Sequence, residues 1–326
     1  MKRYRLALLP TPLHRLPRLE AALDSGPLYL KRDDLIGFGL AGNKARALEY
    51  LLGAALAEGA DVLVTGGAPG SNFAGAAALA ARVAGLDCEV LVSGVPPGRL
   101  PVTLELARRA GATLRFTGAD RERLDELVDA HCAALAAAGR TPYAVPRGGA
   151  TPVGALGFAA AARELACQLE SDAELAGPLG TDAVVVLPTG SGASLAGFLA
   201  GRAAVGATWR TCGVSVSRPR ELVGPHVLGL AGRCATLLGT PAPTEADLHL
   251  RDAVGPGFGR VTDEDRRNVQ LALCTEGVLF DSTYGAKAIT AVIELVRAGE
   301  RAPLVLWHTG GMPSALKLLA VPGVTG

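Results

Sequence analysis

Short apolar runs typical of β-strands alternate with longer Ala- and Leu-rich stretches that have helical spacing, and several of the apolar runs end in glycine. Strands that alternate with helices predict mainly parallel, twisted sheets whose faces are both covered by helices, the α/β class. We expect strands near residue 30 and at 61–67, 88–94, 113–116, 142–145, 184–190, 209–217 and 303–311. We expect helices at 44–58, 71–85, 101–110, 119–138, 152–172, 194–204, 263–275 and 284–298. Residues 219–261 are rich in Pro and Gly and carry no clear pattern.

The alternation forms two series, which predicts two domains without a flexible linker. We place a large domain at 1–47 and 157–326 and a small α/β domain at 48–156. Ligands of such sheets bind beyond the carboxyl ends of the strands. The glycine-rich strand ends at 66–70, 189–193 and 310–311 are therefore the places where a site is expected.

Charge and composition exclude several classes of protein. The 326 residues contain 32 Lys plus Arg and 31 Asp plus Glu, a net charge of +1, which argues against nucleic-acid binding. The six cysteines lie far from one another in the sequence and the five histidines form no closely spaced pair, so we expect neither a disulfide scaffold nor a metal site. Neither a signal peptide nor an apolar stretch long enough to cross a membrane is recognisable, so we expect a cytoplasmic protein.

The segment from Thr189 to Ser194, TGSGAS, lies between a predicted strand and a predicted helix. Its small residues let backbone N–H groups surround a phosphate at the positive end of the helix. A plain glycine-rich turn is the alternative. A dinucleotide site is less favoured because no acidic residue ends the next strand, and no Walker lysine follows the glycines. The segment therefore favours a small phosphate monoester.

Four further features could carry chemistry. Lys44 follows a glycine-rich segment at the start of a predicted helix, where the helix dipole disfavours the charged ammonium. Ser71 and Asn72 follow a strand, although helix capping explains them equally well. Tyr284 precedes a helix, and the run 307–311 closes the last strand. A reactive amine, a phosphate cradle and nearby hydroxyls match the parts of pyridoxal 5'-phosphate.

The chain resembles pyridoxal-phosphate enzymes of the tryptophan-synthase-β-like fold (fold type II), in the group of 1-aminocyclopropane-1-carboxylate deaminase and D-cysteine desulfhydrase. Six segments occur in the order found in that family. They are KRDD…GNKARALEYLL (31–52), PRGGATPVGALGF (146–158), TGSGASLAG (189–197), GPGFG (255–259), TEGVLFDSTYGAKA (275–288) and HTGG (308–311). The resemblance runs through nearly the whole chain, and it implies that fold and a homodimer.

The resemblance also implies roles for individual residues. Lys44 matches the Schiff-base lysine, Asn72 the partner of the ring hydroxyl, and Thr309 the partner of the pyridine nitrogen. Ser71 and Tyr284 match catalytic residues near the substrate. The cofactor phosphate would be held by Thr189, Gly190, Ser191, Gly192, Ala193 and Ser194.

The departures from the family lie on the substrate side. Gly70 and Phe73 flank Ser71-Asn72 where the family commonly has Gln and His or Gln, Phe258 replaces a tyrosine, and Gly285 replaces the deaminase glutamate. We therefore expect Gly70, Phe73 and Phe258 to form a more apolar substrate pocket, suited to a leaving group larger than a bare thiol.

The resemblance implies abstraction of the α-proton of a small amino acid, followed by β-elimination to a 2-oxo acid and ammonia, as in a cysteine desulfhydrase or C–S lyase. β-Replacement, racemisation, deamination of 1-aminocyclopropane-1-carboxylate and a catalytically silent cofactor-binding protein stay open as alternatives.

Overall fold

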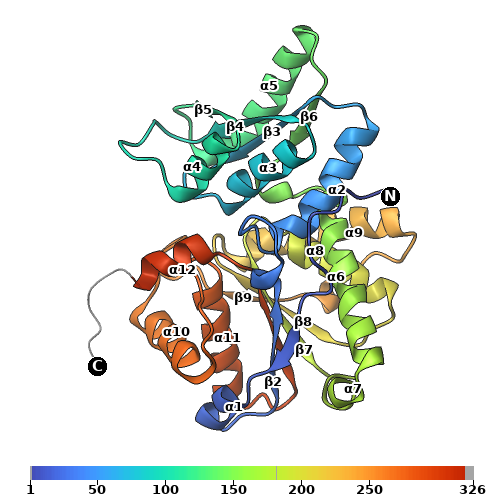
Figure 1. Ribbon diagram of the computed structural model, residues 1–326. Coiled ribbons are helices and arrows are strands. Elements are labelled where there is room, and N and C mark those ends of the chain that lie inside the picture. The colour runs from blue at the N-terminus through green and yellow to red at the C-terminus, as the bar shows by residue number, and fades with distance from the viewer. Residues whose placement is uncertain (1, 181, 320–326) are drawn as a thin grey trace.

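The computed structural model describes residues 2–180 and 182–319, which form two lobes, each built around one sheet (Figure 1). The larger sheet has the strand order β1-β2-β10-β7-β8-β9. Its strands are β1 (Leu13–Arg15), β2 (Leu28–Arg32), β7 (Val184–Thr189), β8 (Arg210–Ser215), β9 (His249–Asp252) and β10 (Leu304–His308). Only β1 pairs antiparallel, and it does so at the edge of the sheet.

The smaller sheet is parallel throughout, with the order β5-β4-β3-β6. Its strands are β3 (Val62–Gly67), β4 (Asp87–Val92), β5 (Thr113–Phe116) and β6 (Pro142–Val145). The α/β class with two mainly parallel sheets is thus confirmed. The domain boundaries at 47/48 and 156/157 stay a prediction, and both fall inside helices, α2 (Lys44–Ala57) and α6 (Pro152–Ser171).

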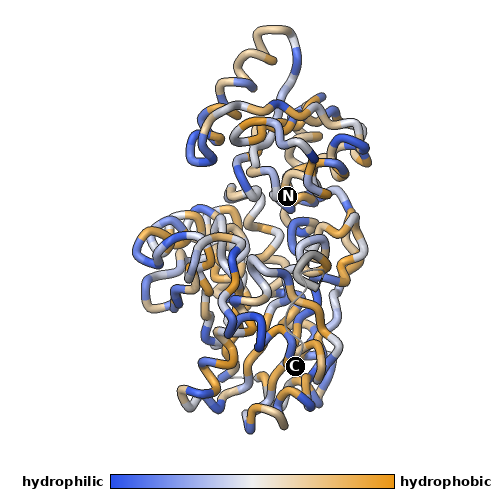
Figure 2. The backbone as a smooth tube through the Cα atoms, turned by 90° about the vertical axis from the view of Figure 1, so that its left-hand side faces the viewer, coloured by the Kyte–Doolittle hydropathy of each residue, from blue (hydrophilic) through white to orange (hydrophobic). Residues whose placement is uncertain are grey.

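Helices cover both faces of each sheet, as buried strands require. In the large lobe, α6, α8 and α9 share one apolar core, and α1, α10 and α11 share another on the opposite face. In the small lobe, α2, α3 and α4 cover one face and α5 the other. Apolar segments run through both lobes in Figure 2. Besides α2 and α6, the helices are α1 (Pro17–Leu23), α3 (Asn72–Val83), α4 (Val102–Arg109), α5 (Leu124–Ala137), α7 (Ala173–Leu179), α8 (Ala193–Ala204), α9 (Arg220–Leu238), α10 (Asp263–Glu276), α11 (Gly285–Arg297) and α12 (Met312–Leu319).

Helix α2 packs against both lobes, and it is therefore the element that positions its own first residue. Leu48 and Leu51 are fully buried in the small-lobe core. On the other side, α2 lies directly against α6, where a Cβ on Gly157 would stand 2.4 Å from the carbonyl oxygen of Arg46. Only glycine allows this approach.

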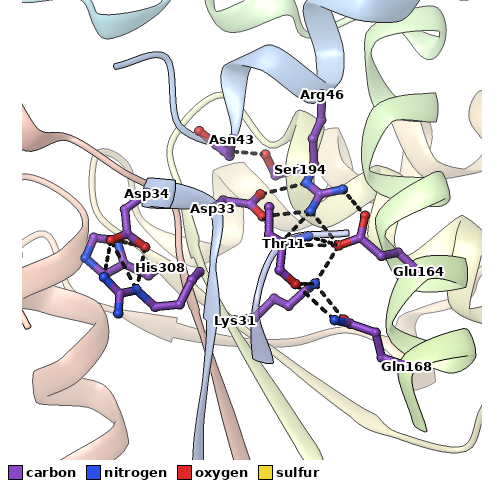
Figure 3. A network of polar contacts seen from close by, with 11 residues as sticks. Thr11, Lys31, Asp33, Asp34, Asn43, Arg46, Glu164, Gln168, Ser194 and His308 are labelled. Atoms are coloured by element: carbon purple, nitrogen blue, oxygen red, sulfur yellow. Dashed lines mark hydrogen bonds and ion pairs between the residues drawn. The ribbon is translucent and has the colours of Figure 1, made fainter. Parts of the chain in front are cut away.

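A buried network of charges fixes the same helix (Figure 3). Arg46 donates to both carboxylate oxygens of Asp33 at 2.8 Å and to both oxygens of Glu164 at 2.9 and 3.0 Å. Lys31 also donates to Glu164, and Thr11 donates to Asp33 at 3.0 Å. The network joins the N-terminal segment, β2, α2 and α6, and its two cations face two carboxylates.

The Pro- and Gly-rich segment without a clear pattern contains α9 and the edge strand β9. Pro225 lies inside α9, where a proline removes one backbone hydrogen bond and lowers the helix propensity of the segment. The helix is therefore not predicted from the local sequence, although packing in the large-lobe core stabilises it. The predicted helix at 119–138 is a single 3-10 turn, Arg121–Arg123, followed by α5. Within the described residues, no helix combines the length and the apolar character needed to span a membrane.

Candidate active site

A cavity that opens to solvent lies where β7 and β10 end, next to the first residues of α2 and α3. Its wall comes from five separate segments of the chain. The lining residues are Ala41, Asn43, Lys44, Asn72, Pro188, Thr189, Gly190, Ser191, Gly192, Ser194, Leu195, Asp281, Tyr284, Thr309, Gly310 and Gly311. Two of the three glycine-rich strand ends that the sequence singles out, 189–193 and 310–311, therefore meet at one place.

Lys44 is the first residue of α2 and points its amine into this cavity. Burial lowers the pKa of Lys44 to about 8. In the described part of the chain, Nζ has neither a hydrogen bond nor an ion pair. A substantial fraction of this amine is therefore neutral near pH 8, and a neutral amine can attack a carbonyl or accept a proton.

Asn43 joins Lys44 to the two glycine-rich loops. Its backbone N–H donates to the Thr309 carbonyl at 3.0 Å, and its side-chain Nδ2 donates to Ser194 Oγ at 2.9 Å (Figure 3). Gly42 makes the approach possible, because a Cβ there would stand 2.2 Å from the same Thr309 oxygen. Sequence reasoning missed Asn43, although it adjoins the predicted lysine.

The loop from Thr189 to Ser194 has a backbone geometry that suits an anion. Gly192 has a φ of 93° and precedes α8, whose first turn has no side-chain cap. The N–H groups of a first helical turn have no intrahelical acceptor and point out of the helix end. His226 Nε2 donates to the Ser191 carbonyl at 3.0 Å and steadies the loop. Ala193 is buried beside the cavity lining.

Asp281 holds Tyr284 in place. Its carboxylate accepts the backbone N–H groups of Thr283, Tyr284 and Gly285 at 2.8–2.9 Å, which caps the start of α11. Burial raises the pKa of Asp281, against these three bonds. Burial and the charge of Asp281 also raise the pKa of Tyr284 to about 12, so its phenol stays protonated at neutral pH and can donate a hydrogen bond.

His308 orients the turn that carries Thr309. Its Nε2 donates to the Leu279 carbonyl at 2.7 Å, and its Nδ1 accepts the Gly310 N–H at 3.2 Å. These bonds assign a neutral ring with the proton on Nε2. The ring also stacks on Phe280, with centroids 4.7 Å apart.

The family with the description "Pyridoxal-phosphate dependent enzyme" matches residues 4–310, which is most of the chain. This chain belongs to the pyridoxal-phosphate-dependent enzymes. Its fold is fold type II, the tryptophan-synthase-β-like fold.

Three relatives show where this pyridoxal-phosphate-dependent enzyme stands within the family. A Pyrococcus horikoshii protein named "Putative 1-aminocyclopropane-1-carboxylate deaminase" is 35% identical, covering 94% of this chain and 92% of its own. The D-cysteine desulfhydrase of Salmonella newport is also 35% identical with the same coverage. The crystal structure of an "ACC deaminase homologue" superposes with a TM-score of 0.88 at 34% identity, covering 98% of this chain and 96% of that chain.

The cavity fits the cofactor on the evidence of its own side chains. It combines an unpartnered amine with a depressed pKa and a capless helix N-terminus. The Asn72 amide and the Thr309 hydroxyl also line it, and neither has a hydrogen-bond partner in residues 2–180 and 182–319. An aldehyde, a phosphate, a ring hydroxyl and a ring nitrogen would each find a complementary group here.

The remaining predicted residues lie outside the cavity lining. Ser71 caps α3, its Oγ accepting the Ala74 N–H at 3.2 Å, so the capping alternative is what the structure shows for that oxygen. Gly70 is exposed beside it. Phe258 is 42% exposed and meets the Tyr284 ring edge to face at 6.0 Å.

Phe73 departs most from the expectation. It is 2% exposed and packs in the small-lobe core, where a Cβ on Gly149 would stand 2.8 Å from its ring. Among the described residues it is not part of the cavity wall. The expectation of a pocket made apolar by Phe73 is therefore corrected: successive residues of a helix point about 100° apart, so Asn72 can face the cavity while Phe73 faces the core.

Proposed function

We propose that this enzyme removes the α-proton of a small amino acid and eliminates its β-substituent, and that water then hydrolyses the released enamine to a 2-oxo acid and ammonia. The observation that carries the proposal is the unpartnered, buried amine of Lys44 beside an anion-binding loop. Relatives named D-cysteine desulfhydrase and 1-aminocyclopropane-1-carboxylate deaminase support this class of reaction.

Residues of this chain would bind each part of the cofactor and move the proton. Residues Thr189 to Ser194 hold the phosphate, Asn72 the ring hydroxyl and Thr309 the ring nitrogen. When bound, pyridoxal phosphate supplies an aldehyde for the substrate amine and a ring that accepts electrons. The freed Lys44 amine takes the α-proton, and the electron pair of the broken C–H bond drives out the β-substituent with its own bonding pair. Ser71 lies at the helix end where we propose that the substrate carboxylate binds.

Two side chains favour elimination over the alternatives. The Thr309 hydroxyl is a neutral partner for the ring nitrogen and does not enforce its protonation, which suits elimination better than transamination. Tyr284 keeps its proton and can donate a hydrogen bond to the departing group. Opening of a cyclopropane ring is less favoured, because Gly285 stands where the resemblance places a glutamate. A Cβ there would lie 2.8 Å from the Phe280 ring, so a larger side chain does not fit.

Proton exchange tests the proposal whatever product follows. Wild-type enzyme loaded with cofactor is incubated in deuterated water with D- and L-amino acids, and loss of the α-proton signal is followed by NMR. Lys44→Ala should slow exchange by about 10²-fold to 10⁴-fold, the usual effect of removing a general base. The matched control, Lys2→Ala, changes an exposed lysine and should exchange at the wild-type rate.

Borohydride reduction should attach the cofactor to the peptide that contains Lys44. Attachment elsewhere, or undiminished exchange by Lys44→Ala, refutes the proposal. Product analysis with and without added thiols separates elimination from β-replacement, and recovery of the opposite enantiomer identifies racemisation.

We also propose that the enzyme is a homodimer and that it works in the cytoplasm. The resemblance to fold type II enzymes supports the first statement. Light scattering of the purified protein measures the assembly, and cell fractionation measures the location.

A further inference from the structure

Within residues 2–180 and 182–319, Arg218 is a half-buried cation without a carboxylate partner. It follows β8, and in the described residues its hydrogen bond runs from Nη2 to the Gly190 carbonyl at 3.4 Å. Burial lowers the pKa of Arg218, and the charges of Arg147 and Arg121 lower it further. The guanidinium groups of Arg147 and Arg121 therefore both act unfavourably on the charge of Arg218.

The three arginines are unequally compensated. Arg147 is neutralised by Asp125, to which its Nε and Nη2 donate at 3.1 and 3.0 Å. Among the residues that the structure describes, Glu122 is the one acidic partner of Arg121, at 3.9 Å on the surface. The Arg121 guanidinium lies 5.0 Å from the centre of the Phe258 ring. Arg121 and Arg218 thus leave a surplus of positive charge.

This surplus adjoins the wall of the cavity that Gly190 and Tyr284 form. A Cβ on Gly190 would stand 3.0 Å from the Tyr284 ring, so these two residues touch. Arg218 contacts the wall through Gly190, and Arg121 approaches it through Phe258, whose ring meets Tyr284. The charge of Arg121 also acts to lower the pKa of Tyr284, against the larger effect of burial.

We propose that Arg121 and Arg218 bind an anionic group at the end of the substrate's side chain. The preferred substrate is then a small amino acid whose β-substituent carries a carboxylate, sulfonate or phosphate. Guanidinium groups are weakly hydrated and match the oxygen atoms of such anions in geometry. This inference rests on the proposed function, because it places the substrate side chain beside Tyr284. It departs from the expectation of a more apolar substrate pocket, which rested on Gly70, Phe73 and Phe258.

A pair of substrates that differ in charge tests the inference. S-Carboxymethylcysteine is anionic, and S-carbamoylmethylcysteine is its neutral amide of the same size. In the proposed elimination the C–S bond breaks and the thiolate leaves with the bonding pair, so both substrates release a thiol without any further reactant. The wild-type enzyme should favour the anionic substrate in kcat/KM, mainly through a lower KM.

Arg218→Gln and Arg121→Gln should each raise KM for the anionic substrate by about tenfold to a hundredfold, the usual effect of losing a charge-assisted hydrogen bond. KM for the amide should change less than about twofold. The control is Arg220→Gln, an exposed arginine two residues further along, which should change neither value. Thermal unfolding of the two variants shows that they fold.

Cofactor affinity is the second measurement, by fluorescence titration of the protein without cofactor. It should be unchanged in both variants. If Arg218→Gln weakens cofactor binding and slows both substrates equally, the arginine serves the cofactor phosphate and the inference is wrong. Equal use of both substrates by the wild type also overturns it. If neutral amino acids exchange their α-proton, the proposed function survives that result, whereas exchange of no amino acid refutes both.

Discussion

The buried charge network of Lys31, Asp33, Arg46 and Glu164 should be a principal source of stability. The change in the free energy of unfolding on Glu164→Gln measures its contribution. Burial alone would raise the pKa of Glu164, but hydrogen bonds from Arg46 and the charges of Arg46 and Lys31 outweigh it and lower the pKa to about 2. A carboxyl with an ordinary pKa of 4.5 in the unfolded chain then stabilises the fold by about 3 kcal/mol at neutral pH. Its side chain is only 11% exposed, so solvent screens it little.

Glu164→Gln leaves Lys31 and Arg46 with Asp33 as the one remaining carboxylate of the network. Loss of one partner from a buried ion cluster costs about 3–5 kcal/mol, which agrees with the figure from the pKa. Urea unfolding at pH 7 measures the loss. Trp307 is a suitable fluorescent reporter, because Arg46 and Lys31 each lie 5.8 Å from its ring.

The pH dependence of the free energy of unfolding tests independently whether folding lowers the pKa of Glu164. Since folding depresses the pKa of Glu164, its stabilisation is complete above about pH 4.5 and is lost as the pH falls toward about 2. The difference between wild type and Glu164→Gln should therefore shrink over that range. Glu170→Gln, the same change at an exposed position of α6, should alter stability by less than about 0.5 kcal/mol. A Glu164→Gln loss below about 1 kcal/mol at pH 7 refutes the reasoning.

Two further predictions concern the site itself. Because burial lowers the pKa of Lys44 to about 8, the rate at which protein without cofactor takes up pyridoxal phosphate should rise about tenfold between pH 7 and pH 9 and then level off, as stopped-flow absorbance would show; a flat profile contradicts it. Asn43→Ala breaks the tie to Ser194 and should weaken cofactor affinity by about fivefold to thirtyfold, measured by fluorescence titration. In the Asn43→Ala variant, the further change Ser194→Ala should lower cofactor affinity by less than it does in the wild type. Full additivity of the two effects would show that the two side chains do not act together.

The convergence of the site could be predicted from the sequence because it follows from topology. The segment from Thr189 to Ser194 begins at the last residue of β7, and Thr309 directly follows β10. The carboxyl ends of parallel strands meet at one edge of a sheet. Lys44 was identifiable because its glycine-rich setting and its place at a helix start are local features. The chain's membership of the pyridoxal-phosphate-dependent enzymes, predicted from segments in their family order, is confirmed.

Contacts between distant segments could not be predicted in the same way. Asn43 and Ser194 lie 151 residues apart, so nothing local marks their hydrogen bond. Asp281 reads as an ordinary loop acid until its three backbone donors are seen. Helix α9 forms because the large-lobe core accepts Val223, Val227 and Leu230, although Pro225 lowers the local propensity. In each case tertiary packing decides what the local sequence leaves open.

Arg46 is buried and Arg218 is half-buried, and the difference in their partners indicates where a charged ligand can bind. Arg46 lies away from the cavity, and its charge is balanced by the carboxylates of Asp33 and Glu164. Arg218, beside the cavity wall, has no such match in the described residues, and Arg147 and Arg121 oppose its charge. A half-buried cation without a counter-charge is costly unless something supplies one. Since the same fold provides carboxylates where they are needed for stability, the missing partner of Arg218 is best explained as an anion that arrives with the substrate.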